Sequence, residues 1–272
     1  MRTDSCSLVS SFLAAGTLPL SRSISQVQSI LSSPNYDCRD LAVHLRKDPT
    51  LTTRVMSVAN SAYFSRHPCD SIDDAINRLG TVQLTRIFSQ VLASSALIQP
   101  MRAYGLQADA LWRRSVFAAV GSEMAAGRSG EDRSSAYMVG LLHLVGMLVV
   151  DSVWNKVGAA QSLRLVSFER EWSTDERILC GHDHAVLGAE LLRQLGFPGN
   201  VVSAISRQYD APIEAVEYSL YIGRLVRSCA YEVPTLDPRM EILREFKLAS
   251  DSQLEAFITD VREEAMLMMR AA

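Results

Sequence analysis

The chain has 272 residues, of which 48% are hydrophobic and 21% are charged, and its formal net charge is -3. A chain of this length and composition can bury a large core, either as one domain or as two closely joined lobes. The slightly acidic balance, with a pI near 6.0, argues against a protein whose main task is to coat nucleic acid, because such proteins have a clearly basic surface.

Cysteine usage and hydropathy bear on the compartment. The five cysteines are odd in number and widely spaced, which fits neither a disulfide framework nor a zinc finger. The apolar piece from Leu8 to Ala15 follows Asp4 and has only Arg2 as positive charge, so it is a poor match to a signal peptide. No later run reaches the roughly 18 uncharged apolar residues needed to span a bilayer. We therefore expect a soluble, cytoplasmic protein.

The first sixty residues predict three helices after a flexible start. Apolar residues at helical spacing predict the first over 24–31,. Asp37 is suited to cap the second helix at its N-terminus. Asp48 repeats this role for the third, with Pro49 at the first helical position and an end near Ala59.

A capping pattern opens the next pair of helices. Ser71 with Asp74 three residues later resembles a capping box, with aspartate in place of the usual glutamate. Gly80 ends this short helix and Thr81 caps the following one, which has a broad apolar face. Pro100 and the residues up to 105 form the best internal boundary, so we expect a first lobe over 17–104.

The second half of the chain also predicts helix after helix. Residues 145–153 are β-branched enough for a strand, but no strand partner occurs elsewhere, so we expect helix or loop there. The other expected helices span 111–127, a segment leading from 133 into 140–150, then 155–170, 174–180, 184–195, 199–208, 213–230 and 251–270. The last contains Met266, Met268 and Met269, which suit either packing or a yielding binding surface.

These elements predict an all-α protein of two packed helical lobes. The second lobe is expected over 105–230, and residues 231–272 are expected to form a helical extension that packs on the domain.

One stretch near the middle, Gly140–Val150, carries a chemical question. It places His143 inside an apolar run between Gly140 and Gly146. A histidine followed by aspartate offers nitrogen and oxygen to a divalent cation, which can activate water. Leu144 stands in that next position and offers no ligand atom.

An ordered series of motifs carries a family resemblance. The series is Asp48-Pro49-Thr50-Leu51, Asn60-Ser61-Ala62-Tyr63-Phe64, Ser71-Ile72 with Ala75-Ile76 and Leu79-Gly80, Leu111-Trp112 with Ser115, Gly140-Leu141-Leu142-His143, His184 with Gly188-Ala189 and Leu191-Leu192, and Gly196-Phe197-Pro198. It resembles the HDOD family, the HD-related output domains, over roughly residues 17–230. The resemblance implies a helical fold whose second lobe is related to HD-type metal phosphohydrolases, and signalling roles in bacteria without demonstrated catalysis in most members.

The resemblance also implies where the metal ligands of catalytic relatives would lie. Arg114 falls at the first histidine, Leu144 at the paired aspartate, Gln208 at a later histidine pair and Arg224 near the late aspartate. Only His143 and His184 remain, and two imidazoles without a carboxylate cannot assemble a mixed nitrogen and oxygen shell. We therefore expect no bound cofactor or metal and no catalytic residue. The candidates for the former metal cavity are Arg114, His143, Leu144, His184, Gln208 and Arg224.

Several of these residues have a structural interpretation beside the functional one. His143 is expected to be satisfied by a backbone carbonyl within the core. Asp183, between His182 and His184, is expected to cap the following helix. Arg114 and Arg224 could hold a phosphate or carboxylate in the former cavity, or they could be surface arginines in local ion pairs.

Three functions from different classes follow. The favoured one is a non-enzymatic signalling module that binds a protein partner, because the scaffold is kept and the metal ligands are not. The second is a sensor of an anionic metabolite or nucleotide second messenger in the former cavity. The third is a residual phosphohydrolase. None of the three involves a nucleic-acid or membrane partner.

Overall fold

The structure is all-α over the residues that it describes, which confirms the predicted fold class. This computed structural model describes residues 4–16, 26–27, 30–31, 37–61, 64, 67–157, 169–210, 247–248 and 250–271. Its helices are α1 (Ser5–Ala14), α3 (Cys38–Arg46), α4 (Pro49–Ala59), α5 (Ile72–Leu97), the 3-10 turn η1 (Arg102–Tyr104), α6 (Ala110–Ser129), α7 (Arg133–Leu142), α8 (Met147–Val157), α9 (Glu169–Cys180), α10 (His184–Gln194), α11 (Gly199–Ser206) and α14 (Asp251–Ala271).

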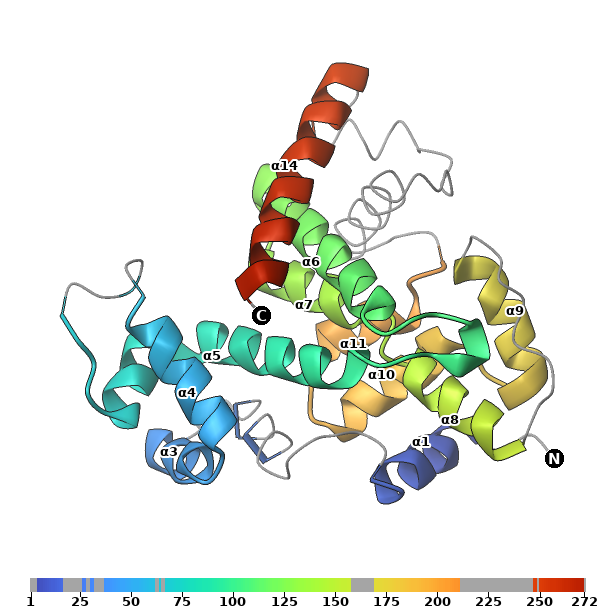
Figure 1. Ribbon diagram of the computed structural model, residues 1–272, viewed down its shortest axis with the longest axis horizontal. Helices are drawn as coiled ribbons and strands as arrows, with labels where there is room; N and C mark the ends of the chain where they lie inside the picture. The colour runs from blue at the N-terminus through green and yellow to red at the C-terminus, as the bar shows by residue number, and fades with distance from the viewer. Residues whose placement is uncertain are drawn as a thin grey trace.

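Two hydrophobic clusters form the interior. The smaller one packs α3, α4 and the first part of α5, up to Val91. The larger one begins at Leu92 of the same helix and takes in α1, the helices α6 to α11 and α14. Figure 1 shows α5 running from the α3 and α4 side of the molecule to the side formed by α6, α7 and α10. The long helix therefore belongs to both lobes and joins them.

Local sequence signals set the helix ends of the first lobe. Asp37 accepts a hydrogen bond from the Arg39 amide at 2.8 Å, and Asp48 accepts one from the Leu51 amide at 3.1 Å. Both predicted caps are confirmed.

The predicted break in the next helix is also confirmed. The Ser71 hydroxyl accepts from the Asp74 amide at 3.1 Å, which completes the expected cap. Gly80 has φ 68° and ψ 173°, a conformation that favours glycine. The helical segments before and after Gly80 follow each other without a gap, so α5 is a helix with a sharp kink at this residue.

A polar contact fastens α5 to the second lobe. The guanidinium of Arg86 donates two hydrogen bonds to Glu123 on α6, at 2.5 and 2.9 Å. It also lies 4.1 Å from the ring centroid of Tyr137 on α7, whose hydroxyl accepts from Gln90 at 3.0 Å. Burial is the main cause that raises the pKa of Tyr137 to about 12, so this hydroxyl stays protonated. The two lobes are thus held by specific polar contacts as well as by apolar packing.

The C-terminal helix α14 packs along α6 (Figure 1). Phe257, Val261 and Ala265 on one face of α14 are fully buried, and the guanidinium of Arg128 lies 4.8 Å from the Phe257 ring centroid. The residue limits predicted for the lobes and the extension stay a prediction.

Two parts of the sequence prediction differ from the structure. Residues expected to be a flexible start form α1, in which Val9 and Phe12 are buried against the larger cluster. A helix this short depends on tertiary packing, which a local pattern does not reveal. The helix expected over 174–180 begins earlier, at Glu169, because Trp172 and Ser173 are buried and hold that turn in place.

Some predicted helices lie wholly or partly outside the described residues. The segment 213–230 lies wholly outside them. The segment 24–31 lies outside them except for residues 26–27 and 30–31, and the segment 155–170 lies outside them at residues 158–168. The stretch 145–153, expected to be helix or loop, is helical in α8 from Met147 onward.

The most apolar part of the chain is used by the core. Residues Arg133–Val157 are apolar and long enough to cross a membrane, but 83% of their most apolar window is buried inside the protein. The stretch consists of α7 and α8, which are separated by a turn at residues 143–146. Its hydrophobic side chains are therefore accounted for by helix packing.

Candidate functional site

The turn between α7 and α8 holds His143 in the core. The His143 side chain is fully buried, and its Nδ1 lies 2.7 Å from the carbonyl oxygen of Gly140. This is the backbone carbonyl contact expected from the sequence. Leu144 is also fully buried and belongs to the larger hydrophobic cluster, so its side chain serves as packing.

The two glycines beside this turn allow close helix contacts. A Cβ atom at Gly140 would lie 2.5 Å from the carbonyl oxygen of Ala118 on α6. A Cβ atom at Gly146 would lie 2.0 Å from the carbonyl oxygen of His184 and 2.5 Å from the amide nitrogen of Gly188 on α10. Since real side chains essentially never approach so closely, both positions require glycine, and the second one brings the turn against the start of α10.

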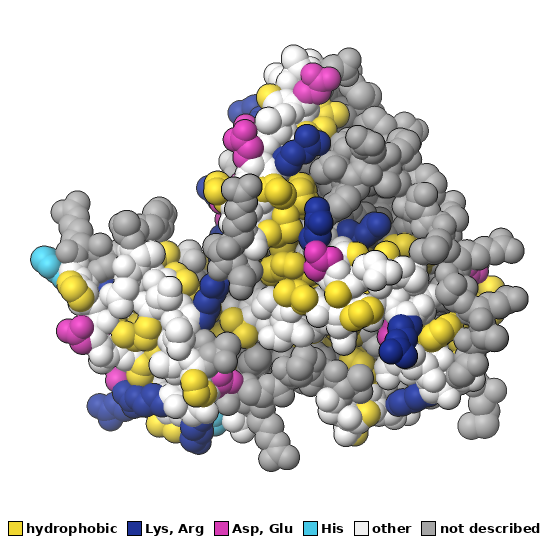
Figure 2. All heavy atoms as spheres, in the orientation of Figure 1, with side chains coloured by type: hydrophobic (Ala, Val, Ile, Leu, Met, Phe, Trp, Pro, Cys, Tyr) yellow, Lys and Arg dark blue, Asp and Glu magenta, His cyan; other side chains and the backbone are white. Residues whose placement is uncertain are grey.

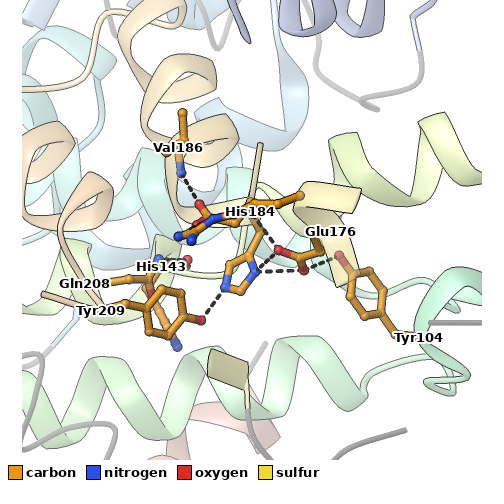
Figure 3. A network of polar contacts seen from close by, with 9 residues as sticks. Tyr104, His143, Glu176, His184, Val186, Gln208 and Tyr209 are labelled. Carbon is orange, nitrogen blue, oxygen red and sulfur yellow. Dashed lines mark hydrogen bonds and ion pairs between the residues drawn. The ribbon is translucent and has the colours of Figure 1, made fainter. Parts of the chain in front are cut away.

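His184, the other retained histidine, lies at that start and is fully buried. Its Nδ1 is 2.7 and 2.8 Å from the two carboxylate oxygens of Glu176 on α9. Its backbone amide donates to the same carboxylate at 2.7 Å, and so does the hydroxyl of Tyr104, also at 2.7 Å. Figure 3 shows the imidazole of His184 between Glu176 and Tyr209, with Tyr104 beyond the carboxylate.

The donor and acceptor roles follow from the chemistry of these groups. Burial, and then the charge of Glu176, raises the pKa of Tyr104 well above its ordinary value, so its hydroxyl remains a donor. An ionised carboxylate only accepts, and therefore Nδ1 of His184 donates as well. The hydroxyl of Tyr209 lies 2.6 Å from Nε2, the other ring nitrogen of His184.

Gln208 closes the other side of the site. Its amide nitrogen donates to the backbone carbonyl of His143 at 2.9 Å, and its side chain is nearly buried. The chain after α11 is thereby tied to the turn at His143. Of the six candidates, the structure brings His143, His184 and Gln208 into one neighbourhood (Figure 3).

Of the two arginine candidates, the structure describes Arg114 alone. The guanidinium of Arg114 lies 5.8 Å from the ring centroid of Trp172, and Trp172 in turn packs on Tyr104 with centroids 5.3 Å apart. Arg224 lies outside the described residues, so the expected pair of arginines stays a prediction. Asp183 caps α10 by accepting from the Val186 amide at 3.0 Å, as expected, and its carboxylate also pairs with Arg177.

Sequence reasoning missed the carboxylate of this site. The premise that the two histidines have no carboxylate is wrong, because Glu176 contacts His184 directly. The sequence did contain one signal for Glu176. This residue lies four residues from both Trp172 and Cys180, on the helix face that all three bury, and a charged residue on a buried helix face indicates a polar partner in the core. The partner Tyr104 comes from a distant segment and gave no such signal.

The groups that the structure describes here do not fit a hydrolytic metal centre as they stand. Nε2 of His184, the nitrogen left for a metal once Nδ1 contacts a carboxylate, lies against Tyr209, Nδ1 of His143 faces a carbonyl, and Leu144 supplies no oxygen. In the part of the chain that the structure describes, no three His, Cys, Asp or Glu side chains are grouped to hold a metal ion. The hydrogen bonds of these groups join η1 to α9, α9 to α10, and the chain after α11 to the turn at His143.

Comparison with known proteins places this fold and these motifs in a family. A model of the HDOD domain matches residues 18–211. The chain belongs to the HDOD domain family. The family suggested by the ordered motifs is therefore confirmed, and the match covers most of the helices described above. No curated protein sequence matches the chain.

Solved structures share the HDOD fold at low sequence identity. An HDOD domain protein of unknown function from Geobacter sulfurreducens is 20% identical with a TM-score of 0.58, and the match covers 96% of each chain. A protein from Shewanella amazonensis, provisionally named a phosphohydrolase, is 21% identical over 93% of each chain with a TM-score of 0.60. One from Marinobacter aquaeolei, provisionally named a signal transduction protein, is 21% identical with a TM-score of 0.66, over 97% of this chain and 66% of that one. At this identity the likeness shows the fold alone.

Proposed function

We propose that this HDOD chain is a non-enzymatic signalling module that acts by binding a protein partner. The observation that carries the proposal is the environment of His184. The family resemblance implies that this histidine stands at a metal-ligand position, and its Nε2, the nitrogen left once Nδ1 contacts Glu176, is taken by Tyr209. A signalling role fits the family and the provisional name of the Marinobacter aquaeolei protein.

The energetics of the site support a structural use of these groups. Glu176 and His184 are fully buried, and removing one partner from such a pair costs about 3–5 kcal/mol. Freeing Nε2 of His184 for a metal would break its contact with Tyr209, and Leu144 would still supply no oxygen. A residual phosphohydrolase therefore has the least support of the three functions considered.

A matched assay of metal content and turnover tests the absence of catalysis. The purified chain is incubated with Mn²⁺, Fe²⁺ or Mg²⁺ and desalted, and then its metal content and its hydrolysis of p-nitrophenyl phosphate and bis-p-nitrophenyl phosphate are measured. We expect no turnover and no difference in bound metal between the wild type and His184→Gln. Stoichiometric metal together with turnover that His184→Gln abolishes would overturn the proposal.

The partner is tested by capture followed by reconstitution. The tagged chain is used to capture proteins from its native cells, with and without added nucleotides, and each captured protein is then purified and titrated against the chain. We expect one protein to bind directly with a dissociation constant of about 10 µM or tighter, a range that regulatory contacts reach. Failure of every captured protein to bind in the purified system would contradict the proposal. The expected setting is the cytoplasm, where Cys6, Cys38, Cys69 and Cys180 would remain the free thiols that they are in the structure.

A sensor that binds an anion in the former metal cavity was the alternative. One arginine of the pair on which it depends, Arg224, lies outside the described residues, and the buried groups His184 and Glu176 already bind each other. A binding site for a small molecule has better support at a different place in the fold.

A further inference from the structure

A pocket of about 540 Å³ lies between the two lobes, and its described lining includes neither His143 nor His184. Its walls come from α4, α5, α6 and α14, so it touches elements of both hydrophobic clusters. Figure 2 shows the molecule hollowed between the α3 and α4 side and the raised helix α14. The volume falls within the range of small-molecule sites.

The chemistry of the lining is selective. Its polar groups are one guanidinium, four hydroxyls and one amide, and its apolar groups include an indole and a thioether. None of the described residues that line the pocket carries a carboxylate. The lining residues are Pro49, Thr53, Arg54, Ser57, Gln90, Val91, Ser94, Ser95, Trp112 and Met268.

Arg54 gives the pocket its charge. It projects from α4 and acts electrostatically on the hydroxyl of Tyr137, which also accepts from Gln90 of the pocket wall and contacts the sulfur of Met268 at 3.2 Å. Arg54 and Gln90 of the pocket lining therefore both act on the Tyr137 hydroxyl. A guanidinium has five N–H donors in one plane, and it binds carboxylate and phosphate groups well.

The apolar part of the pocket lining is formed by Val91, Trp112 and Met268. Trp112 is 6% exposed and Val91 is 9% exposed, so both are anchored in the core and present a preformed apolar wall. A methionine adapts its shape to a ligand at little cost. An apolar or aromatic body that carries an anionic group would match this mixture of apolar and cationic lining residues.

We propose that this pocket between the lobes is a binding site for a small amphipathic anion, a carboxylate or phosphate attached to an apolar or aromatic body. The ligand would contact α4 and α5 on one side and α6 and α14 on the other, and its binding would favour one relative packing of the lobes. Such a site gives the module an input that does not use the former metal cavity. It does not depend on the partner-binding proposal, because its test needs only the purified chain.

Titration with a fluorescent probe tests this site. The probe is 1-anilinonaphthalene-8-sulfonate, an aromatic anion, and its uncharged analogue N-phenyl-1-naphthylamine measures the need for charge. We expect saturable binding of one sulfonate per chain, weaker binding of the analogue, and an affinity about tenfold lower in Arg54→Met, because a charge-assisted contact is lost. Arg39→Met, which removes an exposed arginine from α3, is the matched control and should bind like the wild type.

A second variant keeps the test decisive if Arg54→Met is poorly folded. Ser57 is exposed on α4 and lines the pocket, so Ser57→Phe fills the space without disturbing the core and should abolish binding. Circular dichroism and thermal unfolding verify the fold of each variant. Equal binding by the wild type, Arg54→Met and Ser57→Phe, no saturable binding at all, or a loss of binding only in His184→Gln would overturn the proposal.

Displacement of the bound probe then identifies the ligand class. Octanoate, benzoate and adenosine monophosphate represent an aliphatic carboxylate, an aromatic carboxylate and a phosphate with an aromatic base. Displacement by one of them that is weakened by Arg54→Met supports the site and names its anion. If none of them competes at concentrations near 1 mM, where weak metabolite binding is already measurable, the assignment to carboxylate or phosphate is wrong.

Discussion

Gly146→Ala is expected to destabilise the fold strongly, although alanine is the better helix former. In an unstrained position, replacing glycine by alanine stabilises a protein by about 0.4–1 kcal/mol. At Gly146 the new Cβ atom would lie 2.0 Å from a backbone oxygen of His184, whereas ordinary van der Waals contact begins at 3.4 Å. The obstacle is backbone and cannot rotate away, so α8 would have to move from α10 by about 1.4 Å,.

The expected loss is about 3 kcal/mol in the free energy of unfolding, at the upper end of the usual cost of overpacking. For a chain of this size that loss lowers the melting temperature by about 6–12 °C. Urea titration followed by circular dichroism measures the first quantity, and differential scanning fluorimetry measures the second.

Other glycines provide a graded series of controls. Gly199→Ala meets no atom within 4 Å and should change stability by less than about 0.5 kcal/mol,. Gly188→Ala meets the Gly146 amide nitrogen at 3.0 Å and should be intermediate, and Gly140→Ala meets backbone at 2.5 Å and should be severe. If Gly146→Ala is as stable as Gly199→Ala, the argument from close helix contact is refuted.

Three further predictions concern the polar groups of the core. Glu176→Gln removes an acceptor from a buried carboxylate that receives several hydrogen bonds, so the free energy of unfolding in urea should fall by about 3 kcal/mol; unchanged stability would contradict the network. Burial first, and then the charge of Glu176, raises the pKa of the Cys180 thiol to about 12 from 9.0, so a thiol reagent at pH 8 should modify exposed Cys6 and spare Cys180, as read by peptide mass spectrometry. Because the folded pKa lies above the unfolded one, the stability from this thiol is present below pH 9 and is lost as the pH rises toward 12. Arg86→Met and Glu123→Gln, made singly and together, should show a coupling of about 1–2 kcal/mol, and strictly additive effects would show that this contact does not fasten the lobes.

Much of the fold could be predicted because its signals are local. Asp37, Asp48, Ser71 and Asp183 lie at helix starts and cap them through their own side chains. Such caps involve residues two or three positions apart, so the sequence contains both partners. The break at Gly80 belongs to the same class, because one residue's backbone conformation decides it.

The sequence by itself also determined that His143 is followed by a residue without ligand atoms, and that glycines lie on either side of the turn. Only the tertiary structure decided that Glu176 meets both His184 and Tyr104, and that Tyr209 covers the other ring nitrogen of His184. The physical reason is range: periodicity shows which face of a helix is buried, but the packing of α9, α10 and the residues around η1 decides which buried faces meet. The pocket between the lobes is tertiary for the same reason, since its walls come from four helices that are separate in the sequence.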